Sequence, residues 1–133
     1  DKVSEDLLVI AKEITDSFGT TVELAEKDFD TFTALAGSSP AYIALFIEAL
    51  ADGGVACGLP RAKAQEYAAQ MVLGSAKMVL ESGQHPGALK DAVCSPGGST
   101  IQGVRVLEEK GLRGAVIDAV LAAYDKTKEM GKG

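Results

Sequence analysis

The sequence predicts an all-α fold, a helical bundle. Apolar residues recur at helical spacing over most of the chain, and only residues 20–24 show the alternation of a strand. A third observation is the run from Pro40 to Cys57, which is apolar on nearly every side. A domain of 133 residues has one core and little room to bury such a helix, so we expect a partner subunit to cover part of it.

The composition is that of a globular protein, with 47% apolar and 24% charged residues. The formal net charge is −6, the isoelectric point is about 4.7, and the Lys and Arg residues are scattered. We therefore expect neither nucleic acid nor an anionic membrane as a partner. Interrupted by glycines and prolines, the apolar segments fall short of the roughly 20 residues that span a bilayer. The acidic start of the chain is not typical of a secretory signal peptide.

Potential metal ligands are few. The sequence has two cysteines, Cys57 and Cys94, and one histidine, His85, without the spacing of a zinc site or of a disulfide framework. We therefore expect no metal, and a reducing cytoplasm is the simplest compartment.

The first 25 residues differ in character from the rest. Ser4 is expected to cap a helix that ends near Gly19, and the β-branched residues 20–24 then predict a strand. A strand needs a sheet, and the remaining sequence offers no second one. We interpret residues 1–25 as the end of a preceding α/β domain, and residues 26–133 as a helical domain. An edge strand that pairs with a second copy, or a simple loop, are the alternatives.

Residues 26–133 predict a series of helices separated by glycine and proline. Gly37 and Ser38 are expected to end the first, and Ser39 to cap the second. The expected helices cover residues 28–36, 39–57, 61–82, 86–93, 101–110 and 113–130. The side chains expected to face the core include Phe29, Phe32, Leu35, Ala64, Tyr67, Ala68, Met71, Val116 and Ile117.

The segment Ser95–Thr100 is the best candidate for a ligand site. A Pro-Gly-Gly turn there runs directly into a helix, so backbone amides can approach a ligand at the positive end of the helix dipole. Ser99 and Thr100 add hydroxyl groups. The pattern is typical of a loop that binds a small anion such as a carboxylate. The alternative is a tight interhelical turn with Ser99 or Thr100 as N-cap.

Two further candidates are weaker. Glu48 and Asp52 lie four residues apart on one helix face, where paired carboxylates can do acid–base chemistry, but such a pair is more often a solvated stripe. His85 precedes a proline at a helix start, where a capping or solvated role is the simpler interpretation.

Several stretches of the sequence are similar to one enzyme family. They are residues 33–42, 46–55, 58–61, 85–91, 95–101 and 113–116, and they include the pattern Ser-Pro-Gly-Gly-x-Thr with Gly-Leu-Pro upstream. The chain resembles, over essentially its whole length, the C-terminal part of pyrroline-5-carboxylate reductase, the last enzyme of proline biosynthesis.

The resemblance implies a fold and an activity. Members of this family have an N-terminal Rossmann domain that binds NAD(P)H and a helical domain that interlocks with a second copy into a dimer, and some assemble further. Residues 1–25 would be the last helix and strand of the Rossmann domain. The nucleotide-binding motif is absent from this sequence, so we expect this chain alone to bind neither NAD nor NADP and to be inactive.

The resemblance also implies roles for the loop residues. The carboxylate of pyrroline-5-carboxylate would lie on the backbone amides of Gly98 and Ser99, while Ser95 and Gly97 shape the loop. The Thr100 hydroxyl would hydrogen-bond the ring nitrogen and assist hydride attack on the adjacent carbon. The product would be L-proline.

Two other functions remain open at this stage. A helical assembly module without catalysis would explain the apolar segment 40–57 equally well. A related reductase could act on another cyclic imine or on a β-hydroxyacid, because likeness within a family fixes the fold better than the substrate.

Overall fold

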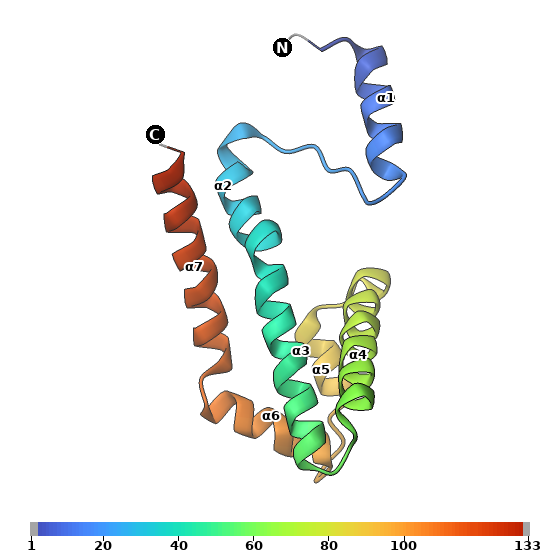
Figure 1. Ribbon diagram of the computed structural model, residues 1–133, viewed down its shortest axis with the longest axis vertical. Helices are drawn as coiled ribbons and strands as arrows, with labels where there is room; N and C mark the ends of the chain where they lie inside the picture. Colours follow the sequence, from blue (N-terminus) through green and yellow to red (C-terminus); the bar gives the residue numbers. More distant parts are fainter. Residues whose placement is uncertain (1–2, 132–133) are drawn as a thin grey trace.

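The computed structural model describes residues 3–131, and the outermost residues of both predicted domains lie outside that range. Within it the chain is helical and has no strand, which confirms the all-α class. Besides the α-helices labelled in Figure 1, the chain has a 3₁₀ turn, η1, and a π-helical segment, η2. In order, the elements are α1 (Glu5–Asp16), η1 (Glu26–Asp28), α2 (Phe29–Phe32), η2 (Thr33–Ser38), α3 (Ser39–Ala56), α4 (Arg61–Ser82), α5 (Pro86–Ala92), α6 (Ser99–Glu109) and α7 (Leu112–Met130).

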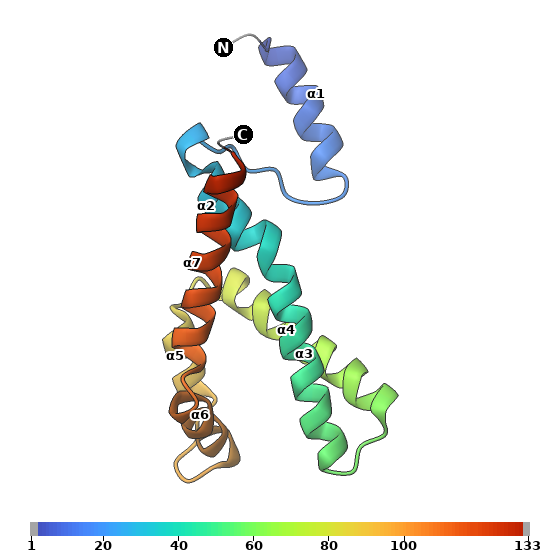
Figure 2. The same ribbon diagram turned by 60° about the vertical axis from the view of Figure 1, so that its left-hand side comes forward.

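Helix α1 stands apart from the other helices in both views (Figures 1 and 2). The Ser4 hydroxyl caps it by accepting from the Leu7 amide at 3.4 Å, as predicted. The helix ends at Asp16, before Gly19. The strand predicted at residues 20–24 is not formed, because no segment of the described chain offers its backbone a ladder of hydrogen bonds.

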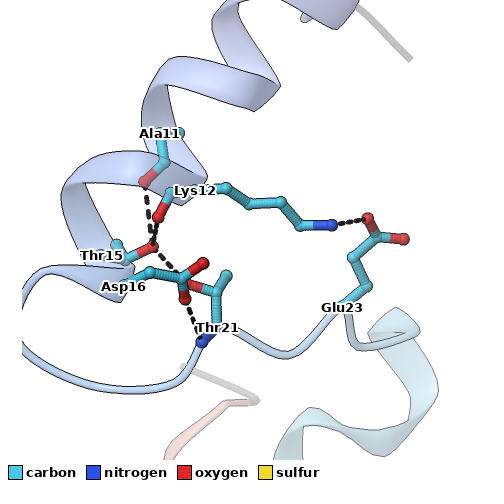
Figure 3. A network of polar contacts seen from close by, with 6 residues as sticks. All are labelled: Ala11, Lys12, Thr15, Asp16, Thr21 and Glu23. Atoms are coloured by element: carbon cyan, nitrogen blue, oxygen red, sulfur yellow. Dashed lines mark hydrogen bonds and ion pairs between the residues drawn. The ribbon is translucent and has the colours of Figure 1, made fainter.

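Polar contacts fold this segment back onto α1 instead (Figure 3). The Lys12 ammonium donates to the Glu23 carboxylate at 2.8 Å, and the Thr21 amide donates to the Asp16 carboxylate at 2.8 Å. The Thr15 and Thr21 hydroxyls are also in contact. The hydrogen bonds from Thr21 lower the pKa of Asp16, and the Lys12 ammonium lowers the pKa of Glu23. The Lys12, Asp16 and Glu23 side chains are exposed, whereas Thr15 and Thr21 are half-buried.

The expected break at Gly37 and Ser38 is wrong. The chain stays helical from Glu26 to Ala56, and η2 joins α2 to α3. A π turn has wider hydrogen bonding than an α-helix, so it can accommodate the Pro40 ring, which would clash with the preceding α-helical turn. Ser39 does not cap a helix, because its hydroxyl donates back to the Ala34 carbonyl at 3.4 Å.

The continuous helix corrects a second expectation. By length and composition, the helix from Glu26 to Ala56 is apolar enough to cross a membrane, with a mean hydropathy of 1.4 in its most apolar window. Dividing the segment at Gly37 concealed this length. An apolar helix of this kind is equally typical of a surface that another subunit covers.

Helices α3 and α4 form the best-packed pair in the molecule. Their contact is built on small side chains, because Ala51, Ala64 and Ala68 are buried between them. A Cβ atom added to Gly54 would lie 3.3 Å from the Cβ of Ala64, so the two backbones are already close. Pro60 and the left-handed Gly83 bound α4, as the sequence predicts.

Helix α7 packs along η2 and α2, on the far side of the long helix from α4 (Figure 1). Ala34 is fully buried, and the Tyr42 hydroxyl donates to the Ala119 carbonyl at 3.3 Å. Helix α6 leads into α7 through Gly111, whose φ is 75°. This corner places the end of α5 and the start of α6 away from α1 (Figure 2).

Most of the side chains expected in the core are exposed in the single chain. Only Ala34, Ala51, Ala64 and Ala68 are buried apolar residues among those described. The accessible surface is 10435 Å², whereas a compact chain of this mass exposes roughly 6,600 Å². The large side chains have no second layer to pack against, which is why the inward predictions fail. Among them, Phe29, Phe32, Leu35, Tyr67, Met71, Val116 and Ile117 are each about half exposed.

Candidate functional site

The loop between α5 and α6 contains the predicted ligand segment. Gly97 has a φ of 70°, in the left-handed region that side chains other than glycine rarely adopt. The Gly98 amide then donates to the Ser95 carbonyl at 3.1 Å, which closes a tight turn. The two glycines thus serve different purposes, since Gly97 supplies the turn and Gly98 supplies a close approach.

Gly98 has no room for a side chain. A Cβ atom there would collide with the Ser95 hydroxyl and would lie 3.2 Å from the Ser95 carbonyl oxygen. The Ser95 side chain therefore packs directly on the Gly98 backbone. This contact supports the prediction that Ser95 and Gly97 shape the loop, and it ties the position of the Gly98 amide to Ser95.

The start of α6 carries free donors. Gly98 occupies the N-cap position without a side-chain hydrogen bond, so neither Ser99 nor Thr100 is the N-cap. Within residues 3–131 the amides of Ser99, Thr100 and Ile101 have no backbone acceptor, as the first turn of any helix requires. These amides lie at the positive end of the α6 dipole, where a carboxylate is favoured.

The loop presents these donors on the surface of the single chain. Ser95, Gly97, Ser99 and Thr100 are exposed, and Gly98 is half-buried. Thr100 is the second residue of α6, so its hydroxyl lies within one turn of the free amides. The arrangement can bind an anion on one side while offering a hydroxyl to a neighbouring atom. One chain supplies only part of the wall of such a site.

An apolar groove of about 490 Å³ lies between the end of α5, α6 and α7. Lys90 and Arg113 bring positive charge to it. Each has a carboxylate partner, Asp91 at 2.8 Å and Glu108 at 2.6 Å, and the Asp91 carboxylate raises the pKa of Lys90. Sequence reasoning missed this groove, because its residues come from three helices and no motif joins them. Its lining is Lys90, Val104, Leu107, Glu108, Leu112, Arg113, Val116 and Ile117.

The weaker sequence candidates do not form a second catalytic site. Asp52 pairs with Arg61 at 2.6 Å, so it is not coupled to Glu48. His85 caps α5, which confirms the capping interpretation. Cys57 and Cys94 are free thiols. Within the described part of the chain, no three His, Cys, Asp or Glu side chains gather as metal ligands would.

Comparison with known proteins supplies the family. Residues 26–130 match the sequence family described as pyrroline-5-carboxylate reductase dimerisation. The chain belongs to this family. Over 130 residues it is 54% identical to the pyrroline-5-carboxylate reductase of a Synechocystis species, covering 98% of this chain and 49% of that protein. It is 56% identical over 115 residues to the Escherichia coli enzyme of the same name, covering 86% of this chain and 43% of that enzyme.

Solved structures agree with this family. The 1-pyrroline-5-carboxylate reductase of Streptococcus pyogenes matches with a TM-score of 0.88 and 54% identity, over 96% of this chain and 49% of that one. The Plasmodium falciparum pyrroline carboxylate reductase, solved with NADP bound, matches with a TM-score of 0.91 and 40% identity, over 98% of this chain and 53% of that one. The chain spans about half the length of the relatives it matches.

Proposed function

We propose that this chain is the dimerisation and substrate-binding half of an NAD(P)H-dependent reductase that converts 1-pyrroline-5-carboxylate to L-proline. The single observation that carries the proposal is the Ser95–Thr100 loop, a glycine turn that leaves the first amides of α6 free. The family match, together with relatives named for this reaction at more than half identity, supports the substrate. The Plasmodium relative solved with NADP supports that cofactor.

In the proposed site the loop holds the substrate by its carboxylate. The free amides of Ser99 and Thr100 bind this group, whereas the Gly98 amide, which the sequence analysis also assigned to it, stays bonded to the Ser95 carbonyl at 3.1 Å. The Thr100 hydroxyl lies against the imine nitrogen. The reduced nicotinamide supplies a hydride to the carbon of the C=N bond. As the C=N bond becomes single, its electron pair moves to the nitrogen, which takes a proton from solvent water to give the amine of L-proline. A hydrogen bond from Thr100 to that nitrogen stabilises the electron pair as it moves. A fixed carboxylate aligns the carbon with the incoming hydride.

The domains and partners follow from the same proposal. Residues 1–25 are the end of a nucleotide-binding domain, residues 26–133 form the helical domain, and the chain by itself binds no nucleotide and is inactive. A second copy covers the exposed apolar faces. This accounts for the accessible surface of the single chain, which is about 3,800 Å² larger than that of a compact monomer of the same mass. We propose a homodimer in the cytoplasm, with neither nucleic acid nor a membrane as partner.

The test is NADPH oxidation by the complete protein that contains this chain, with pyrroline-5-carboxylate as substrate. Thr100→Ala should lower kcat about a hundredfold, because it removes the hydroxyl from the reacting nitrogen. Thr100→Ser keeps a hydroxyl and should retain most of the rate. A complete protein that does not reduce this substrate would contradict the function, and a Thr100→Ala variant as fast as the wild type would contradict the role of Thr100.

A helical assembly module without catalysis is the second candidate. The exposed apolar surface favours it, because a dimer interface needs no ligand. Both functions require a dimer, so oligomeric state does not separate them. Binding of L-proline to the complete protein does, since a pure assembly module has no site for it. A reductase of another cyclic imine would be recognised by comparing such substrates on the same protein.

A further inference from the structure

The only histidine in the sequence, His85, begins helix α5. Its backbone is extended, with φ of −60° and ψ of 133°, and its Nδ1 accepts a hydrogen bond from the Gly87 amide at 3.0 Å. This is the geometry of an N-cap, in which asparagine or aspartate usually provides the acceptor. The imidazole Nδ1 here takes the place of that oxygen.

Only one protonation state of the imidazole can make this bond. Neutral imidazole has an acceptor nitrogen, whereas both ring nitrogens of the protonated form are donors. An Nδ1–H group would face the Gly87 amide, donor against donor. The cap therefore requires a bare Nδ1 facing the Gly87 amide, and it is lost when the acceptor is removed.

The surroundings of His85 offer nothing to replace the lost bond. Within residues 3–131, His85 makes no ion pair. The nearest charged side chains along the sequence already have partners, since Glu81 pairs with Lys77 at 3.5 Å and Lys90 pairs with Asp91 at 2.8 Å. Helix α5 has seven residues and packs only weakly on the other helices of the described chain. Its stability therefore depends strongly on its cap.

Helix α5 leads directly into the Ser95–Thr100 loop. The Val93 amide bonds to the Lys90 carbonyl and the Cys94 amide to the Asp91 carbonyl, at 3.3 and 3.1 Å. These bonds set the direction in which the chain enters Ser95. We propose that His85 is a positioning residue, whose imidazole Nδ1 holds the start of α5 and thereby orders the loop. The effect on catalysis rests on the function proposed above.

Hydrogen exchange measured by mass spectrometry on the complete protein tests the cap without any need for activity. After correction for intrinsic rates, exchange in the peptide covering residues 86–98 should be about fivefold faster in His85→Ala, which lacks the acceptor, than in the wild type. His85→Asn keeps an acceptor, so its exchange should stay close to that of the wild type.

A matched control lies three residues upstream. The Ser82 hydroxyl accepts from the Gln84 amide at 3.3 Å, a local bond of the same kind that lies before α5. Ser82→Ala should therefore leave the exchange of the peptide unchanged. Exchange in His85→Asn as fast as in His85→Ala would overturn the proposal, and so would a His85→Ala protein as protected as the wild type.

Kinetics then connect the cap to substrate binding. The KM of His85→Ala should exceed that of the wild type about fivefold, with kcat unchanged, and His85→Asn should restore the KM of the wild type. Equal KM values in His85→Ala and the wild type would refute the link from α5 to the loop. A complete protein without reductase activity would refute the proposed function, while exchange would still decide on the cap.

Discussion

Replacing Gly98 with alanine tests the structure of the ligand loop most sharply. The new methyl group would collide with the Ser95 hydroxyl and press on the Ser95 carbonyl at 3.2 Å. The hydroxyl can rotate away, but the carbonyl is backbone and accepts the hydrogen bond that closes the turn. The turn must therefore open, and overpacking of this kind costs about 1–3 kcal/mol.

The cost should appear in substrate binding, because in the proposed site the same backbone carries the amides that hold the carboxylate. About 1.4 kcal/mol corresponds to a tenfold change in an equilibrium constant. We therefore expect the KM of the complete protein for pyrroline-5-carboxylate to rise about tenfold in Gly98→Ala, within a range of roughly fivefold to a hundredfold. Steady-state kinetics that follow NADPH oxidation measure this directly.

Gly103 in the same helix provides the control. A Cβ atom there meets nothing within 4 Å, and alanine is favoured over glycine inside a helix by about 1 kcal/mol. Gly103→Ala should leave KM unchanged and stabilise the protein slightly. Ser95→Gly combined with Gly98→Ala removes one of the two collisions and should recover part of the affinity. A Gly98→Ala protein with the KM of the wild type would refute the proposed loop geometry.

Three further predictions concern the rest of the molecule. The free energy of unfolding should fall by about 3 kcal/mol for each hundredfold dilution of the chain, as measured by denaturant titration at several concentrations, because a second copy completes the core. Ala51→Leu should destabilise the protein by about 1–3 kcal/mol in the same assay, because Ala51 lies buried between α3 and α4. Finally, the hydrogen bonds from Thr21 lower the pKa of Asp16 in the folded state. The contact between Asp16 and Thr21 is therefore present at pH values above the ordinary pKa of aspartate, and it is lost as the pH falls below the lowered pKa. The Thr21 amide, followed by NMR, should become exposed to exchange at that point, and should already be exposed at neutral pH in Asp16→Ala.

The sequence predicted the helices of the C-terminal half well. Helices α4 to α7 lie within a residue or two of the expected ranges, because Pro60, Gly83 and Gly111 mark their ends through backbone geometry that is local in the sequence. The division at Gly37 failed for a related reason. Glycine and proline normally interrupt an α-helix, but here a π turn accommodates Pro40 and the helix continues.

The direction of the side chains could not be predicted from one chain. Periodicity identifies an apolar face correctly, as it does for Phe32 and Met71, but not what covers that face. Both side chains remain about half exposed, which is expected where the core is shared between subunits. Similarly, the strand predicted at residues 20–24 has the right composition, while a strand exists only with a partner.

The backbone geometry of the Ser95–Thr100 loop was predictable because it is local in the sequence. A turn, a close backbone approach and a helix start within six residues all follow from Ser95 to Thr100. The groove beside Lys90 and Arg113 was not, because it depends on how α5, α6 and α7 are placed relative to one another. The capping role of His85 was predicted, whereas its acceptor atom required coordinates.

The central claim is that the start of α6 holds the substrate carboxylate. A crystal structure of the complete protein with L-proline tests it most directly. The account predicts the proline carboxylate within hydrogen-bonding distance of the Ser99 and Thr100 amides, with the ring nitrogen next to the Thr100 hydroxyl. Proline bound elsewhere, or held through its carboxylate by a cationic side chain such as Lys90 or Arg113, would contradict it.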